Sequence, residues 1–399
     1  MARSFDSCLR ILSAVLLVAL GSSAIAVASA GAQTTEPVVV GVVMSLTGRD
    51  AAFGQEGLAG INIALGEAND EGGVHGRPIT VQVYDDQSDP IHAADGVRRL
   101  VGECHPVGII GSNTSMVTAA AAVAAQSVGV PLVVPEATNP TITAIGDWIY
   151  RVCFCDPDMA GALATYAYQE LNVRRVAILT EEKHEYTASL TKYFRGRFTG
   201  LGGEIVFDST YAVGTTDFSG AVRRLATSRP DAILVSGFYP EAGAVVAEAR
   251  RQNLNVAFLG GDGWESDGLF SAAGDAITDK SRIYIASHFS AEVHRAKVRG
   301  FVDEFRERYG RTPITSSALG YDAMGLILSS LDHTADVSPA GLKVALLSGH
   351  HEGVTGHITV DASRNPSKKV IILQAKPDHH FAYVQATAPA QPANEAGRE

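Results

Sequence analysis

Short apolar segments alternate with longer amphipathic segments from residue 38 onward. Residues 38 to 44 (VVVGVVM) are continuously apolar and rich in β-branched side chains, as in a strand that is buried on both faces. In the next segment Leu58, Ile61, Leu65 and Ala68 recur at three- and four-residue spacing, which is the period of one helical face. Strands that alternate with helices in this way are typical of βαβ units, which form parallel sheets.

The alternation predicts two successive series of elements, followed by a third group. The first series has further strands at 79–84, 107–110 and 132–134, with helices at 90–104 and 115–128. The second has strands at 175–180, 204–208, 232–236 and 256–259, with helices at 157–171, 187–201, 217–228 and 240–252. The third group is a strand at 283–286, three helices to about residue 348, and strands near 354–360 and 369–374.

The third group determines the predicted domain organisation. Its helices have no strands of their own nearby, so we expect them to pack on the first sheet. The last strands are expected to join the second sheet. We therefore predict an α/β fold of two lobes joined by three crossings, with a single continuous sheet as the alternative. The N-terminal lobe is expected to comprise residues 38–153 and 287–353, and the C-terminal lobe residues 154–286 and 354–385.

The two ends of the chain differ from the rest. Arg3 and Arg10 precede the apolar run 11–20, and a stretch of small residues then ends in Ala28-Ser29-Ala30. This pattern predicts a cleaved signal peptide over residues 1–30 and a mature protein outside the cytoplasmic membrane. The alternative, a permanent anchor helix, requires roughly 20 apolar residues. Residues 386–399 are rich in Ala and Pro without large apolar side chains, which predicts a disordered tail.

Composition and charge exclude several classes of protein. Charged residues make up 19% of the 399 and the net charge is −11, with no run of Lys and Arg, so nucleic acid is not an expected partner. No G-x-S-x-G motif is present, and neither G-x-G-x-x-G nor a P-loop follows the first strand. We therefore expect neither an enzyme nor a bound cofactor.

The metal-binding and redox residue types also form no recognisable site. The histidines at 350, 351, 357, 379 and 380 lack the spacing of C-x-x-C or H-E-x-x-H motifs, so they are interpreted as solvated loop residues and no metal is expected. The mature chain has three cysteines, Cys104, Cys153 and Cys155, so they cannot all be paired in disulfides within the chain. They are interpreted as small apolar residues of the interior.

The residues that follow the predicted strands carry complementary chemistry. In open α/β sheets, ligands bind beyond the carboxyl ends of the strands. Ser45, Ser115 and Thr138 follow strands of the first series, where hydroxyls and helix N-termini favour an anion. Asp262 follows a strand of the second series with aromatic residues nearby, a setting that favours an ammonium. Together they suit a zwitterion, although Ser and Thr at helix starts also act as N-caps and Asp between glycines also forms turns.

Seven segments in this order resemble the type I periplasmic solute-binding proteins of ABC transporters, close to the leucine/isoleucine/valine-binding family. They are VGVVMSLTG, VGIIGSNTS, VPLVVPEAT, YRVCFCDPD, GFYPEAG, GGDG and VTGHITVD, and the resemblance covers about residues 38 to 375. It implies a mature protein in the periplasm with two Rossmann-like lobes that close on a ligand. The three hinge crossings would be Arg151 to Cys155, Ile285 to His288 and Val354 to Ile358.

The function implied by the resemblance is capture of a small amino acid for import. The protein would be the extracytoplasmic component of an ABC importer, bind a branched-chain type of amino acid in the inter-lobe cleft, and deliver it to a membrane permease. A monomer is expected. Relatives also bind amides, urea or aromatic acids, and the same fold serves in sensor domains, so these remain alternatives.

The resemblance also assigns polar ligand-binding residues. Ser115 and Thr138 would hold the ligand carboxylate through their hydroxyls, supported by the backbone at Glu136. Asp262 would pair with the ligand ammonium. Glu136 stands where well-known members have Ala, and we expect its side chain to point away from the ligand.

Aromatic ligand-binding residues are assigned in the same way. Phe53 would form a wall for the ligand side chain, with Tyr186 and Tyr321 as further pocket aromatics. Phe238 stands where the best-known members have Tyr, and the neighbouring Tyr239 would supply the missing hydroxyl.

Overall fold

A computed structural model describes residues 36–388 of the chain. The predicted signal peptide and most of the predicted tail lie outside the described residues. Strand β14 (His380–Thr387) includes residues 386 and 387, so the tail cannot begin at residue 386 as predicted.

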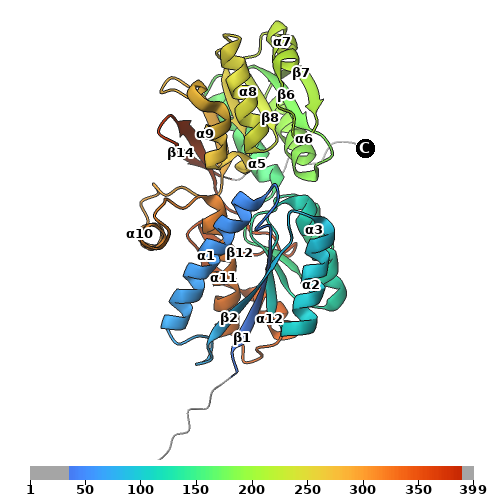
Figure 1. Cartoon of the computed structure of the whole chain (residues 1–399), viewed down its shortest axis with the longest axis vertical. Helices are drawn as coiled ribbons and strands as arrows, with labels where there is room; N and C mark the ends of the chain where they lie inside the picture. Colours follow the sequence, from blue (N-terminus) through green and yellow to red (C-terminus); the bar gives the residue numbers. More distant parts are fainter. Residues whose placement is uncertain (1–35, 389–399) are drawn as a thin grey trace, which may run out of the picture. The chain divides into compact units, whose positions relative to one another are not determined.

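The first sheet has five parallel strands in the order β2-β1-β3-β4-β5. On one face, helices α2 and α3 contribute to a single apolar core, and on the other, helices α1 and α11 pack against each other (Figure 1). The strands are β1 (Val38–Met44), β2 (Ile79–Asp85), β3 (Gly108–Gly111), β4 (Leu132–Val134) and β5 (Ile149–Arg151). The helices are α1 (Ala51–Asp70), α2 (Pro90–Cys104), α3 (Ser115–Val128), the short α4 (Thr141–Ala144), α10 (Ala296–Tyr309), α11 (Thr315–Asp332) and α12 (Pro339–Ser348).

Strand β1 has a continuous apolar sequence because both of its faces are buried. Val43 contributes to the core beneath α2 and α3, whereas Val40, Val42 and Met44 contribute to the core beneath α1 and α11. Because successive side chains of a strand point to opposite faces, a strand covered on both sides needs apolar residues at every position.

The second sheet has seven strands in the order β14-β13-β10-β9-β8-β6-β7. Strands β6 to β10 are parallel, and their order β7-β6-β8-β9-β10 repeats the topology of the first sheet. Strands β13 and β14 are antiparallel additions at one edge. The strands are β6 (Arg175–Glu181), β7 (Glu204–Tyr211), β8 (Ala232–Ser236), β9 (Ala257–Gly260), β10 (Ile283–Ser287) and β13 (Val370–Lys376), with β14 as above. The helices are α5 (Asp156–Gln169) and α6 (Glu185–Gly200) in one core, and α7 (Ser219–Thr227), α8 (Tyr239–Arg251) and α9 (Asp267–Ala273) in the other.

The strand predicted near residues 354–360 does not join the second sheet as expected. The segment 354–360 contributes β12 (His357–Thr359), which pairs with β11 (His350–Glu352) and not with the second sheet. Val354 and Ile358 are buried in the core of the first sheet, and the carboxylate of Asp322 on α11 accepts hydrogen bonds from the backbone N–H groups of Val354 and Thr355. The prediction that this segment joins the second sheet is therefore wrong, whereas the next predicted strand is β13 and does join it.

Candidate functional site

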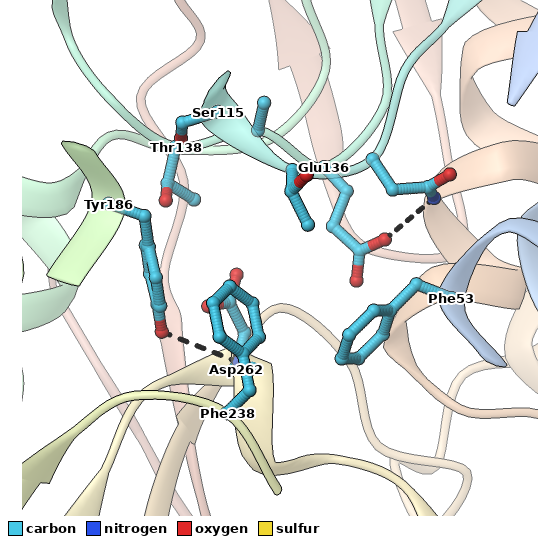
Figure 2. A pocket seen from close by; sticks show the side chains of 11 residues that line it. Phe53, Ser115, Glu136, Thr138, Tyr186, Phe238 and Asp262 are labelled. Carbon is cyan, nitrogen blue, oxygen red and sulfur yellow. Dashed lines mark hydrogen bonds between the residues drawn. The ribbon is translucent and has the colours of Figure 1, made fainter. Parts of the chain in front are cut away.

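One cavity is lined by residues from both sheets, and seven of the nine predicted site residues are among them (Figure 2). About 300 Å3 of space there, including its opening to solvent, is not filled by protein atoms. The lining residues are Phe53, Asn113, Thr114, Ser115, Glu136, Ala137, Thr138, Tyr186, Phe238, Asp262 and Gly263.

The start of helix α3 forms one wall of the cavity. Ser115 is the first residue of this helix and is buried, and its Oγ accepts a hydrogen bond from the backbone N–H of Asn139 at 3.3 Å. The strand before it ends at Gly111, which has a φ of +144° and whose missing Cβ would lie 1.9 Å from the carbonyl oxygen of Val43. Only glycine fits there, so the chain can turn sharply from β3 and present the helix N-terminus, which favours an anion.

The loop that carries Thr138 follows strand β4 and is fixed by a buried cation. The Arg151 side chain is fully buried, and its guanidinium donates hydrogen bonds to the carbonyl oxygens of Ala137 at 3.1 Å and Asn139 at 2.7 Å. The hydroxyl of Thr138 is thereby held near that of Ser115 (Figure 2). Ser45, the third hydroxyl singled out in the sequence, instead donates to Asp86 at 2.6 Å and does not line the cavity.

Aromatic rings form much of the remaining wall. Phe53 projects from α1 and is 3% exposed, yet its ring packs with residues of the second sheet, 6.1 Å from the Phe238 ring and 5.8 Å from the Tyr239 ring. The ring of Tyr186, from α6, lies 5.4 Å from that of Phe238. These rings supply apolar surface for the uncharged part of a ligand.

Asp262 reaches the cavity from the turn after strand β9. Its Oδ1 accepts a hydrogen bond from the backbone N–H of Gly263 at 3.0 Å, and its Oδ2 lies 3.1 Å from Nε2 of His288. Burial lowers the pKa of His288, so its imidazole is neutral at pH 7. A Cβ at Gly261 would lie 2.3 Å from the hydroxyl of Tyr186, which explains the glycine immediately before Asp262.

Glu136 also lines the cavity, so the expectation that its side chain points away is wrong. It is 8% exposed, and its carboxylate accepts hydrogen bonds from Ser316 Oγ at 2.6 Å and from Asn113 Nδ2 at 3.0 Å. Burial raises the pKa of Glu136 to about 8, and the negative charges of Asp262 and Glu265 act in the same direction.

Two predicted aromatic residues do not line the cavity. Tyr239 begins α8 and packs on Phe53 from behind the lining residues. Tyr321 lies in the core between α11 and α1, where its hydroxyl donates to Glu67 at 2.6 Å and its ring lies 4.9 Å from that of Phe301. The expectation that Tyr321 is a pocket aromatic is therefore wrong.

Neither a metal centre nor a membrane span is found in the part of the chain that the structure describes. Within residues 36–388, no group of three or more His, Cys, Asp or Glu side chains is arranged to hold a metal ion. None of the helices in the same range combines the length and the apolar character that crossing a bilayer requires.

Comparison with known proteins identifies the family. The periplasmic binding protein family matches residues 37–380. The chain belongs to this family. Among its relatives, the Leu/Ile/Val-binding protein homolog 1 of Brucella abortus is 25% identical over 378 residues, covering 92% of this chain and 98% of the relative. The Leu/Ile/Val-binding protein of Escherichia coli K12 is 28% identical over 65% of this chain and 70% of its own length.

Solved structures agree with this assignment. The branched-chain amino acid transporter substrate-binding protein LivJ of Streptococcus pneumoniae, in complex with isoleucine, has a TM-score of 0.82 and 30% identity, covering 88% of this binding protein and 99% of LivJ. The leucine-binding protein LivK of Thermotoga maritima has the same TM-score at 28% identity, with the same coverage. The predicted type I periplasmic binding protein fold, close to the leucine/isoleucine/valine-binding family, is thereby confirmed. The members of this family are solute-binding proteins.

Proposed function

We propose that this binding protein captures an α-amino acid in the described cavity as the extracytoplasmic component of an ABC importer. The observation that carries the proposal is the opposed polarity of the cavity. Ser115 and Thr138 line it beside the N-terminus of α3, and the carboxylate of Asp262 lines it from the other sheet. An α-carboxylate fits the first group and an α-ammonium fits the second.

The apolar walls support an amino acid with an aliphatic portion. Phe53, Tyr186 and Phe238 would pack against the ligand's carbon chain. Several relatives are named for leucine, isoleucine and valine, and LivJ was crystallised with isoleucine. Amino acids of the branched-chain type are therefore the first candidates.

The remaining parts of the proposal concern location, motion and partner. The chain would be exported to the periplasm, bind as a monomer, and deliver its ligand to a membrane permease. The two sheets would belong to two lobes, with boundaries near residues 153 and 287. The third crossing would follow residue 360, because Val360 still contributes to the core of the first sheet. The lobes would close on the ligand, as in a hinge.

The proposal is tested by asking whether binding requires both the carboxylate and the ammonium of the ligand. Thermal unfolding is measured with leucine, isoleucine, valine and the other common amino acids, and then with the deaminated acid and the decarboxylated amine of each one that binds. A ligand at 100 times its Kd should stabilise the protein by about 2.7 kcal/mol. Loss of either group should abolish the shift. A deaminated acid that binds equally well would contradict the proposal and favour a plain carboxylic acid as the ligand.

A further inference from the structure

The cavity is lined by two carboxyl groups, whereas an α-amino acid with an uncharged side chain brings a single cation. Two carboxylates line it, Glu136 and Asp262, and no Lys, Arg or His stands among its described lining residues. If Asp262 pairs with the α-ammonium, as proposed above, Glu136 is left without a cationic partner.

Within the described residues, the hydrogen-bond partners of Glu136 bring no positive charge. Both hydrogen bonds to its carboxylate come from neutral groups, the hydroxyl of Ser316 and the amide of Asn113. The guanidinium of Arg49 donates to Glu181, and that of Arg151 donates to backbone carbonyls. A buried carboxylate is costly unless it is paired, so this position favours a cation brought by a ligand.

The surroundings are nevertheless arranged for the ionised form of Glu136. Ser316 lies in the first turn of α11, where the helix dipole favours a negative charge. Figure 2 shows the Glu136 carboxylate and the ring of Phe53 both facing the cavity, and this ring packs with that of Phe238. Aromatic faces attract ammonium and guanidinium groups, so the same end of the cavity offers both an anion and aromatic rings to a cation.

We propose that Glu136 selects an amino acid whose side chain ends in a positively charged N–H donor, such as lysine, ornithine or arginine. This inference rests on the proposed function, because it assumes that the α-carboxylate and α-ammonium occupy the positions described there. It differs on the side chain, where it places a basic group instead of the branched-chain type suggested by the names of the relatives. The aliphatic part of such a side chain would pack on Phe53 and Phe238, and its terminal group would reach the carboxylate of Glu136.

The test compares lysine with norleucine, which has the same carbon chain without the terminal ammonium. Calorimetry with the unaltered protein should give at least about 30-fold tighter binding for lysine or arginine than for norleucine or leucine. Glu136→Gln should remove most of that preference and leave norleucine binding unchanged or tighter. Glu103→Gln removes one negative charge from an exposed position of α2 and should leave the preference intact.

Each other outcome has a distinct meaning. If leucine and norleucine bind as tightly as lysine and arginine to the unaltered protein, the inference about Glu136 is overturned and the proposed function stands. If no α-amino acid binds at all, the proposed function is contradicted, and the inference about Glu136, which depends on it, is contradicted with it. The comparison of lysine with norleucine requires no variant, so it decides the inference even if Glu136→Gln does not fold.

Discussion

Arg49 and Glu181 form a bidentate ion pair that joins the two sheets at the edge of the cavity. Arg49 Nη1 and Nη2 donate to the two carboxylate oxygens of Glu181 at 2.9 and 2.6 Å. Arg49 lies two residues before the start of α1, whereas Glu181 is the last residue of β6. The guanidinium also lies 4.8 Å from the centre of the Phe238 ring and 3.5 Å from the carboxylate of Glu241. The pair therefore links the two sheets beside an aromatic wall of the cavity.

Removing this pair is expected to speed ligand release. The Arg49 side chain is 30% exposed and that of Glu181 is fully buried, so the pair is worth more than an exposed one. Arg49→Gln leaves Glu181 without its cation and should raise the dissociation rate of a bound amino acid by roughly tenfold, which is about 1.4 kcal/mol. Stopped-flow fluorescence after dilution of the complex measures this rate.

The matched control uses an exposed ion pair. Arg98 and Asp95 form a pair on α2 with more than half of each side chain exposed. Arg98→Gln should leave the dissociation rate unchanged. Equal rates in Arg49→Gln and Arg98→Gln would show that the pair with Glu181 does not hold the ligand-bound form.

Ligand binding is expected to bring the two groups of cavity residues together. If the lobes close as a hinge, Ser115 and Thr138 approach Asp262 and the radius of gyration decreases. Small-angle X-ray scattering with and without saturating ligand measures the change. An unchanged radius at saturation would argue strongly against a two-lobed trap.

Asp262 is expected to contribute to the binding of every α-amino acid, whatever its side chain. Asp262→Asn removes the charged partner of the ammonium in a buried site, and such truncations cost about 2 to 5 kcal/mol. The affinity should therefore fall by roughly 30-fold or more. Titration calorimetry with several amino acids measures the loss, which should be similar for leucine and for lysine.

Asp279 provides the control for this substitution, because it is exposed in the turn before β10. Asp279→Asn removes the same charge and should leave the affinity unaltered. A nearly neutral effect of Asp262→Asn would mean that the ligand carries no ammonium at that position.

The sequence was sufficient to predict most of the fold because the buried strands are short apolar runs with regular spacing. Ser115, Thr138 and Asp262 could be predicted for a related reason, since the carboxyl ends of parallel strands meet at one edge of a sheet. Short elements such as β5 and α9 were missed because three to seven residues do not establish a period.

The errors concern side chains whose direction depends on distant residues. Glu136 points into the cavity because Ser316, 180 positions away, donates to it from α11. Tyr321 turns away because Glu67 on α1 accepts its hydroxyl, 254 positions away. The Arg49–Glu181 pair spans 132 positions and leaves no local pattern. Such contacts depend on how the elements pack, which hydrophobic periodicity does not encode.

The stability of the ligand-free protein is expected to fall as the pH rises from 6.5 to 8. Burial raises the pKa of Glu136 to about 8 and those of Asp156 and Glu265 to about 7. In this range the folded protein binds more protons than the unfolded chain, whose carboxyls titrate near pH 4, so higher pH favours unfolding. Each group that stays protonated contributes a slope of up to about 1.4 kcal/mol per pH unit.

Other buried groups affect different pH ranges. Burial lowers the pKa of His184 and His351 to about 4, whereas the pKa of histidine in the unfolded chain is about 6.5. These two groups therefore change the stability mainly between those two pH values. Burial lowers the pKa of Lys368 to about 8, so this group makes the stability rise with pH, but mainly above pH 8. Urea unfolding at pH 6.5, 7.2 and 8.0 measures the slope, which Asp156→Asn should reduce. Stability that rises over this interval would contradict the assignment of protonated buried carboxyls.

Binding of a basic amino acid is expected to strengthen as the pH rises from 6 to 8. Burial, with the nearby charges of Asp262 and Glu265, raises the pKa of Glu136, so its carboxyl is largely protonated at pH 6 to 7 in the free protein. Asn113 and Ser316 are the uncharged groups that contact it, and burial lowers the pKa of His288, next to Asp262, which favours its neutral imidazole. A cationic side chain requires the ionised carboxylate, so binding must release the proton.

Calorimetry of lysine binding at pH 6, 7 and 8 measures this linkage. The affinity should rise by up to about tenfold per pH unit and level off above pH 8, where Glu136 is already ionised. At pH 6.5 the measured enthalpy should depend on the ionisation enthalpy of the buffer, as expected for release of one proton. Glu265 titrates in the same range, so Glu136→Gln is needed to isolate the contribution of Glu136, and it should remove most of the pH dependence. A lysine affinity that is constant or falls with pH would mean that Glu136 does not ionise toward the ligand.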